Sequence, residues 1–259
     1  MPNALWPSGL FLVRHGESAG NVASDAAHEA GLPVIDIAIR DMDVPLSALG
    51  ERQAAAVGRW IGALPEAERP RVVYASPYVR ARTTAEIALD AAGLRVDRDV
   101  TFVIDERLRE REFGILDRLT RRGIEERHPE QAEFRTHLGK FYHRPPGGES
   151  WTDVLLRLRS FVDTISRECA GERILIVSHQ VVVLMFRYIL EQLTEAEILA
   201  IDAEHQLANC SVTSYELEQG DDGGRHARLA LRLFNHVAPI EDEPGVAVTT
   251  EPDVPVAPK

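Results

Sequence analysis

Two histidines directly follow apolar runs in this chain, one near its start and one in its second half. The run 10–13 leads into Arg14 and His15, and the run 173–177 leads through a serine to His179. A neutral imidazole can act as a nucleophile or base near pH 7, and a guanidinium is a permanently charged donor for anions. In α/β sheets, ligands gather beyond the carboxyl ends of strands. These residues therefore predict an anion site that contains a nucleophile or base.

A third strand-then-helix unit adds arginines to this candidate site. The apolar run 71–75 precedes a helical segment whose first turns contain Arg80 and Arg82. An arginine on an exposed helix face is simply a solvated charge, and Arg82 fits that interpretation. Each histidine alone is also more simply a surface histidine or one with satisfied hydrogen bonds. His15 and His179 occupy equivalent strand-end positions, however, and this equivalence favours a shared site.

The elements that must position these residues alternate between strands and helices. Short apolar runs predict buried strands, and amphipathic segments with polar caps predict helices. The predicted strands cover 10–13, 71–75, 101–104, 173–177, 211–217 and 227–234, and the predicted helices begin near Ser47, Ser76, Ser150, Val181 and Thr194. The last two strands form a hairpin around a turn at 220–224, so the predicted α/β domain has a mixed sheet.

Three segments lack a clear hydrophobic period. Residues 19–45 predict an active-site loop with one helical turn, and residues 115–147 predict a covering insertion with a helix at 118–127. Residues 238–259 are rich in proline and acidic residues, which predicts a disordered tail. The expected organisation is therefore one domain at 1–237 followed by that tail.

Composition narrows the classes of function. The 259 residues carry a formal charge of −12, which argues against nucleic-acid binding because no large basic field is available. No apolar stretch approaches the roughly 20 residues that cross a bilayer, and no signal peptide is evident. Cys169 and Cys210 are expected to be free thiols, and neither cysteines nor histidines show metal-site spacing. We expect a cytoplasmic protein without membrane binding or a metal, and its oligomeric state is open.

Four motifs in a fixed order resemble those of the histidine phosphatase superfamily (branch 1, phosphoglycerate mutase-like). They read LVRHGES from residue 12, SPYVRARTTA from residue 76, LREREFG from residue 108 and VSH from residue 177. The resemblance covers about residues 9–190 of the chain. It implies a three-layer α/β/α sandwich with a mixed, mostly parallel central sheet.

Carried over residue by residue, the resemblance makes His15 the nucleophile that becomes phosphorylated and Glu110 the general acid/base. The phosphoryl group would be surrounded by Arg14, Arg80 and His179, with Asn21 nearby. Elementary chemistry agrees, because phosphoryl transfer mainly needs positioning and neutralisation of the phosphate oxygens, and fork-shaped arginines supply both. A carboxylic acid can protonate the departing alkoxide and then activate water. This scheme needs no cofactor.

Within the family, the residues that face the substrate separate hydrolysis from mutase chemistry. Arg111 matches the mutase form, whereas Glu112 stands where that form usually has a histidine, and Gln180 replaces a commoner glycine. The sequence of residues 139–150 most resembles that of broad-range and acid phosphatase members of the superfamily. Further contacts to a small phosphorylated substrate are expected from Gln180, Arg111 and Arg144. We favour a phosphomonoesterase; a bisphosphoglycerate-dependent phosphoglycerate mutase and a non-catalytic phosphate-binding module are the alternatives.

Overall fold

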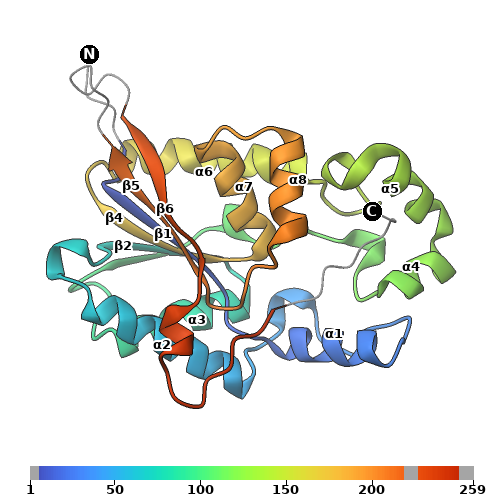
Figure 1. The fold of residues 1–259 in the computed structure, drawn as a ribbon, viewed down its shortest axis with the longest axis horizontal. Helices are drawn as coiled ribbons and strands as arrows, with labels where there is room; N and C mark the ends of the chain where they lie inside the picture. The colour runs from blue at the N-terminus through green and yellow to red at the C-terminus, as the bar shows by residue number, and fades with distance from the viewer. Residues whose placement is uncertain (1–5, 219–226, 251–259) are drawn as a thin grey trace.

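The computed structural model describes residues 6–218 and 227–250 and is built around one twisted sheet (Figure 1). In the described part of the chain the sheet has six strands in the order β3-β2-β4-β1-β5-β6. Their bounds are β1 Gly9–Arg14, β2 Val72–Ala75, β3 Thr101–Ile104, β4 Arg173–Ser178, β5 Val212–Glu218 and β6 Arg228–His236. Strands β3, β2, β4 and β1 are parallel, and β5 and β6 run antiparallel at one edge. The predicted mixed, mostly parallel sheet is confirmed.

Helices cover both faces of the sheet, which gives the predicted three-layer α/β/α sandwich. Helices α2 (Ala48–Ala63) and α3 (Val79–Ala91) lie on one face, and α6 (Trp151–Glu168) and α7 (Gln180–Leu190) lie on the other (Figure 1). Alternate side chains of each strand point to opposite faces, so β1 contributes to two separate apolar cores. Phe11 packs in the core under α2 and α3, whereas its neighbour Leu12 packs in the core under α6 and α7.

The remaining helices lie around the carboxyl ends of the parallel strands or beside the main layers. They are α1 Ala19–Glu29, α4 Arg121–Arg127, α5 Pro129–Tyr142, α8 Glu195–Glu204 and α9 Ala238–Glu241. Helices α1, α4 and α5 lie together at the same end of the sheet (Figure 1). The two candidate histidines, which directly follow β1 and β4, lie at this end. In the described residues no helix is long and apolar enough to span a membrane.

Several local predictions need correction. The segment 19–45 is not mainly a loop, because it contains the eleven-residue helix α1. Ser18 and Asn21 cap the N-terminus of this helix with a reciprocal capping box. Helix α3 begins at Val79 and not at Ser76, and the insertion contains α5 in addition to the expected helix α4. The predicted turn at 220–224 lies in the range 219–226, outside the described residues.

The prediction of a disordered tail is wrong for residues 238–250. This segment forms α9 and then packs along α2, where the Gln53 amide donates to the main-chain oxygen of Ala247 and to Thr249 Oγ1, both at 2.9 Å. The Asn209 main-chain N–H donates to the Thr249 main-chain oxygen at 2.8 Å. These contacts are mostly to backbone and so leave no hydrophobic period in the sequence. The rest of the predicted tail, 251–259, lies outside the described residues.

Candidate active site

His15 and His179 meet because the two strands that carry them are neighbours. Strands β1 and β4 pair in parallel, with Arg14 in register with Ser178, so each histidine is the next residue along the same edge. The two imidazole rings lie 5.1 Å apart between centroids. Both side chains are buried, and the edge they share is the one at which α/β sheets bind ligands.

The hydrogen bonds of His15 fix which ring nitrogen is free to react. Its Nδ1 lies 2.7 Å from the Gly16 main-chain oxygen, which can only accept, so Nδ1 carries the proton. Its Nε2 lies 3.3 Å from Arg80 Nε, whose N–H donates toward it. Burial lowers the pKa of His15 well below its usual value, and the charges of Arg80 and Arg14 lower it further. His15 is therefore neutral at pH 7, with an unprotonated Nε2.

His179 forms a hydrogen bond with a hydroxyl and lies near the predicted general acid/base. Its Nε2 lies 2.8 Å from Ser76 Oγ, and its Nδ1 lies 3.5 Å from Glu110 Oε2. Burial lowers the pKa of His179 well below its usual value, followed by the charge of Arg80 and the neighbouring His15. The structure thus brings His15, His179 and Glu110 into one cluster, as the motifs predict.

Both predicted phosphate-binding arginines are buried beside His15. Arg14 leaves the end of β1 almost fully enclosed, and its guanidinium donates to the main-chain oxygen of Leu207. Arg80 lies in the first turn of α3, and its guanidinium packs over the Tyr78 ring at 5.0 Å from the centroid. Two buried guanidinium groups beside a neutral imidazole provide a strong local positive field in a protein of net negative charge.

A partly open cavity of about 230 Å³ lies in front of His15. Its lining includes His15, Asn21, Arg80, Glu110 and Gln180. Small-molecule sites usually measure roughly 300–1,000 Å³, so this cavity suits a small substrate. Of the predicted substrate contacts, Asn21, Arg80, Gln180 and Arg111 line the cavity, whereas the buried Arg14 and His179 are not among its lining residues.

The cavity lining also contains apolar and charged side chains. The apolar ones include Ile35, Ile37, Leu116, Leu119 and Ile124, and the cationic ones include Arg111, Arg135 and Lys140, of which Lys140 is paired with Asp202. Arg111 donates to the Glu149 main-chain oxygen at 2.6 Å, and burial together with the Arg135 charge lowers its pKa to about 10. Burial, Arg135 and Arg111 lower the pKa of His143 to about 4. The arginines supply positive charge that an anionic group of a substrate can neutralise.

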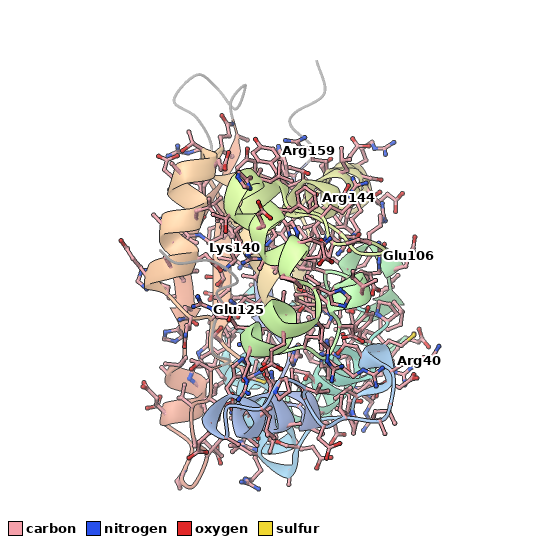
Figure 2. The ribbon with its side chains drawn as sticks, turned by 90° about the vertical axis from the view of Figure 1, so that its right-hand side faces the viewer. Arg40, Glu106, Glu125, Lys140, Arg144 and Arg159 are labelled. Carbon is pink, nitrogen blue, oxygen red and sulfur yellow. The ribbon has the colours of Figure 1, made fainter. Side chains whose placement is uncertain are left out.

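Arg144 does not reach the cavity. Its guanidinium binds the carboxylate of Asp153, with Nε and Oδ2 2.7 Å apart, and its side chain is mostly exposed. Figure 2, which looks onto α4 and α5, shows Arg144 to one side of these helices. Arg144 therefore forms a surface ion pair with Asp153 in the first turn of α6, and its charge is not available to a ligand in the cavity.

Sequence reasoning missed two residues that touch this cluster. Asn209, in the segment before β5, donates from Nδ2 to the His15 main-chain oxygen at 3.1 Å. Asp41, in the 3₁₀ helix Asp41–Asp43, binds the guanidinium of Arg80. Asn209 follows an aperiodic segment, and Asp41 is one of several acidic residues in 36–43, so neither position carries a signal of its own.

A neutral buried histidine faced by two arginines, at the carboxyl edge of a mixed α/β sheet, is typical of phosphoryl-transfer enzymes. Comparison with protein families gives the same result. Residues 10–229 match the model of the histidine phosphatase superfamily (branch 1), and the chain belongs to this family.

The curated relatives include mutases. A probable phosphoglycerate mutase GpmB of Yersinia enterocolitica is 33% identical over 172 residues, covering 66% of this chain and 68% of that protein. A 2,3-bisphosphoglycerate-dependent phosphoglycerate mutase of Gloeobacter violaceus is 30% identical over 198 residues, covering 76% and 81%. These relatives support a phosphoryl-transfer enzyme.

The similar solved structures include a phosphatase. A mycobacterial glucosyl-3-phosphoglycerate phosphatase in complex with VO3 superposes with a TM-score of 0.66 at 25% identity, covering 88% of this chain and 99% of that one. The family therefore contains both hydrolases and mutases among the proteins similar to this chain.

Proposed function

We propose that this protein is a phosphomonoesterase that hydrolyses a small phosphorylated metabolite through a phosphohistidine on His15. The observation that carries the proposal is the state of His15: its Nδ1 proton is held by the Gly16 main-chain oxygen, and Nε2 is unprotonated and faces Arg80. A neutral imidazole attacks phosphorus without first losing a proton, and a fixed Nδ1 partner keeps the ring oriented.

In the first step, the His15 Nε2 lone pair forms a bond to phosphorus while the bond from phosphorus to the ester oxygen breaks. Glu110 gives its proton to the departing oxygen, which leaves as an alcohol. In the second step, water attacks phosphorus, Glu110 takes a proton from that water, and the nitrogen–phosphorus bond breaks to release inorganic phosphate. Arg14, Arg80 and His179 surround the phosphoryl oxygens and stabilise the transition state in both steps.

The charge around the cavity favours hydrolysis over mutase chemistry. A mutase must receive a second phosphate-bearing molecule while the phosphohistidine is present. Glu112 occupies the place usual for a histidine and accepts a hydrogen bond from Tyr78 Oη at 2.7 Å, so it presents negative charge beside the phosphate clamp. This negative charge disfavours a bisphosphate ligand, which itself carries several negative charges.

The test is phosphoenzyme trapping combined with a substrate panel. We expect hydrolysis of a generic aryl phosphate in the presence of a metal chelator, and a phosphoenzyme that is labile in acid and stable in alkali. Labelling that persists in His15→Ala would exclude His15 as the nucleophile, and a strict divalent-ion requirement would contradict the mechanism. Efficient interconversion of phosphoglycerates, primed by the bisphosphate, would show that the mutase alternative is correct.

A further inference from the structure

Arg80 is bound along one edge by a carboxylate that the proposed mechanism does not use. The Asp41 main-chain oxygen accepts from Arg80 Nη1 at 2.6 Å, and its carboxylate oxygens lie 3.0 Å from Nη1 and 3.0 Å from Nη2. The Arg80 side chain is only 6% exposed, whereas that of Asp41 is 41% exposed and reaches in from the 3₁₀ helix. Asp41 also lines the cavity.

These contacts determine which N–H groups of Arg80 remain for a phosphoryl group. A guanidinium has five N–H donors: one on Nε, two on Nη1 and two on Nη2. Asp41 accepts one hydrogen of Nη1 at its main-chain oxygen and one hydrogen of Nη2 at its carboxylate, and its second carboxylate oxygen pairs with Nη1 at 3.0 Å. The Nε hydrogen, which points at His15 Nε2, and the second Nη2 hydrogen lie along the edge of the guanidinium that Asp41 does not bind, where they form a parallel pair.

The remaining edge of Arg80 is the one that faces the reacting nitrogen. Arg80 Nε lies 3.3 Å from His15 Nε2, the atom that would bond to phosphorus. The Tyr78 ring packs against the face of the same guanidinium, so the plane of the group is also held. With its end bound by Asp41 and its face covered by Tyr78, Arg80 is kept in one orientation before a substrate arrives.

We propose that Asp41 is a positioning residue for phosphoryl transfer, which holds Arg80 so that its Nε–Nη2 edge binds the phosphoryl group on His15. This inference rests on the proposed function. It also assigns a role to the segment between α1 and α2, because Ile35 and Ile37 from the same segment belong to the apolar lining that would contact the leaving group. The segment thus contacts both ends of a bound ester.

The segment is in turn fixed by the covering insertion. The Ile35 main-chain N–H donates to the Arg118 main-chain oxygen at 2.9 Å, and Arg118 Nη1 donates to the Ile37 main-chain oxygen at 2.9 Å. The hydroxyl of Thr120 donates to the Leu32 main-chain oxygen at 2.7 Å. A continuous set of contacts therefore runs from the insertion through Asp41 and Arg80 to His15.

The test compares Asp41→Ala and Asp41→Asn with the matched control Asp43→Ala. Asp43 lies in the same 3₁₀ helix and forms an exposed ion pair with Arg40, with Nε and Oδ2 2.7 Å apart. Arg40 is labelled in Figure 2. We measure kcat and KM on an aryl phosphate, and the affinities for inorganic phosphate and for vanadate. Thermal unfolding shows that each variant is folded.

A misplacement of a positioning group by about 1 Å can reduce the rate about 100-fold. We expect kcat to fall roughly 10- to 100-fold in Asp41→Ala, with a smaller change in KM. Vanadate resembles the five-coordinate transition state, so its affinity should fall more than that of phosphate. Asp41→Asn keeps a side-chain oxygen and should lose less, and Asp43→Ala should match the wild type.

Two results would overturn the inference. Unchanged kcat in both Asp41 variants would show that the pair does not position Arg80. Tighter phosphate binding in Asp41→Ala would show that Asp41 competes with the substrate for the guanidinium. If instead the wild type neither hydrolyses phosphate esters nor binds phosphate or vanadate, the proposed function itself fails, and the inference that rests on it fails with it.

Discussion

A methyl group added at Gly50 should inactivate the site although Gly50 has no side chain that could take part in the chemistry. Gly50 lies in the first turn of α2, directly beneath the segment that carries His15 out of β1. A Cβ atom built on Gly50 would lie 2.0 Å from the main-chain oxygen of Glu17 and 2.8 Å from its nitrogen. Both neighbours are backbone atoms, so no side chain can rotate away to make room.

The size of the effect follows from this contact. Separations under 3.0 Å are essentially never seen for a Cβ atom, so the backbone at Glu17 must move by about 1 Å from α2. That displacement, two residues from His15, should lower kcat/KM about 100-fold. Alanine improves helix propensity by about 1 kcal/mol over glycine, whereas overpacking costs about 1–3 kcal/mol. The variant should thus be slightly destabilised and still fold, while losing most of its activity.

The assay is steady-state hydrolysis of an aryl phosphate by Gly50→Ala, normalised to folded protein by circular dichroism. Gly62→Ala is the matched control: Gly62 lies in the same helix, its added Cβ would be 3.0 Å from the Ala92 oxygen, and it contacts α3 far along the helix from His15. The control should keep near-wild-type kcat/KM. Wild-type kcat/KM in Gly50→Ala would refute the reasoning, because the close approach of α2 would then not determine the position of His15.

Two further predictions concern pH and a missed residue. His15 and His179 stay neutral when folded, because burial and then the Arg80 charge lower their pKa values well below 6.5, yet both take up protons on unfolding below that pH. The free energy of unfolding should therefore fall as the pH drops below about 6.5, by up to about 1.4 kcal/mol per pH unit for each histidine. Urea titrations at several pH values measure this free energy, and a pH-independent value would contradict the prediction. Asn209→Ala removes the side-chain donor to the His15 main-chain oxygen, which also accepts from the Cys210 main-chain N–H, and should destabilise the protein by about 0.5–1.5 kcal/mol; an unchanged urea midpoint would contradict it.

The strand-end residues could be predicted from the sequence because one simple rule places them. Buried parallel strands are continuous apolar runs, and the residues that follow them share one edge of the sheet. His15, Arg14 and His179 follow from that rule. Arg80 became a candidate because its helix follows another predicted strand. The family motifs added Glu110, which lies on an irregular segment that hydrophobic periodicity cannot place beside β1.

Helices α1 and α5, which contribute to the cavity, could not be predicted, because their buried sides are partly polar. The buried residues of α1 are Asn21, Ser24 and Ala27, and those of α5 include Gln131 and Arg135. A search for apolar residues at helical spacing treats such segments as irregular, since burial here is against a polar cavity and not an apolar core. The buried polar residues that suit these helices to binding a ligand are also the reason that their sequences show no apolar residues at helical spacing.

Positioning of the clamp and contact with the leaving group are linked in this structure. The segment that supplies Asp41 to Arg80 also supplies Ile35 to the apolar lining, and the insertion supplies Leu119 to the same lining. The insertion packs tightly onto this segment, since a Cβ on Gly123 would lie 1.8 Å from the Pro33 main-chain oxygen. A leaving group that contacts this shared lining would thus stabilise the arrangement that orients Arg80. Binding energy from the non-reacting part of a substrate can in this way contribute to the rate of phosphoryl transfer.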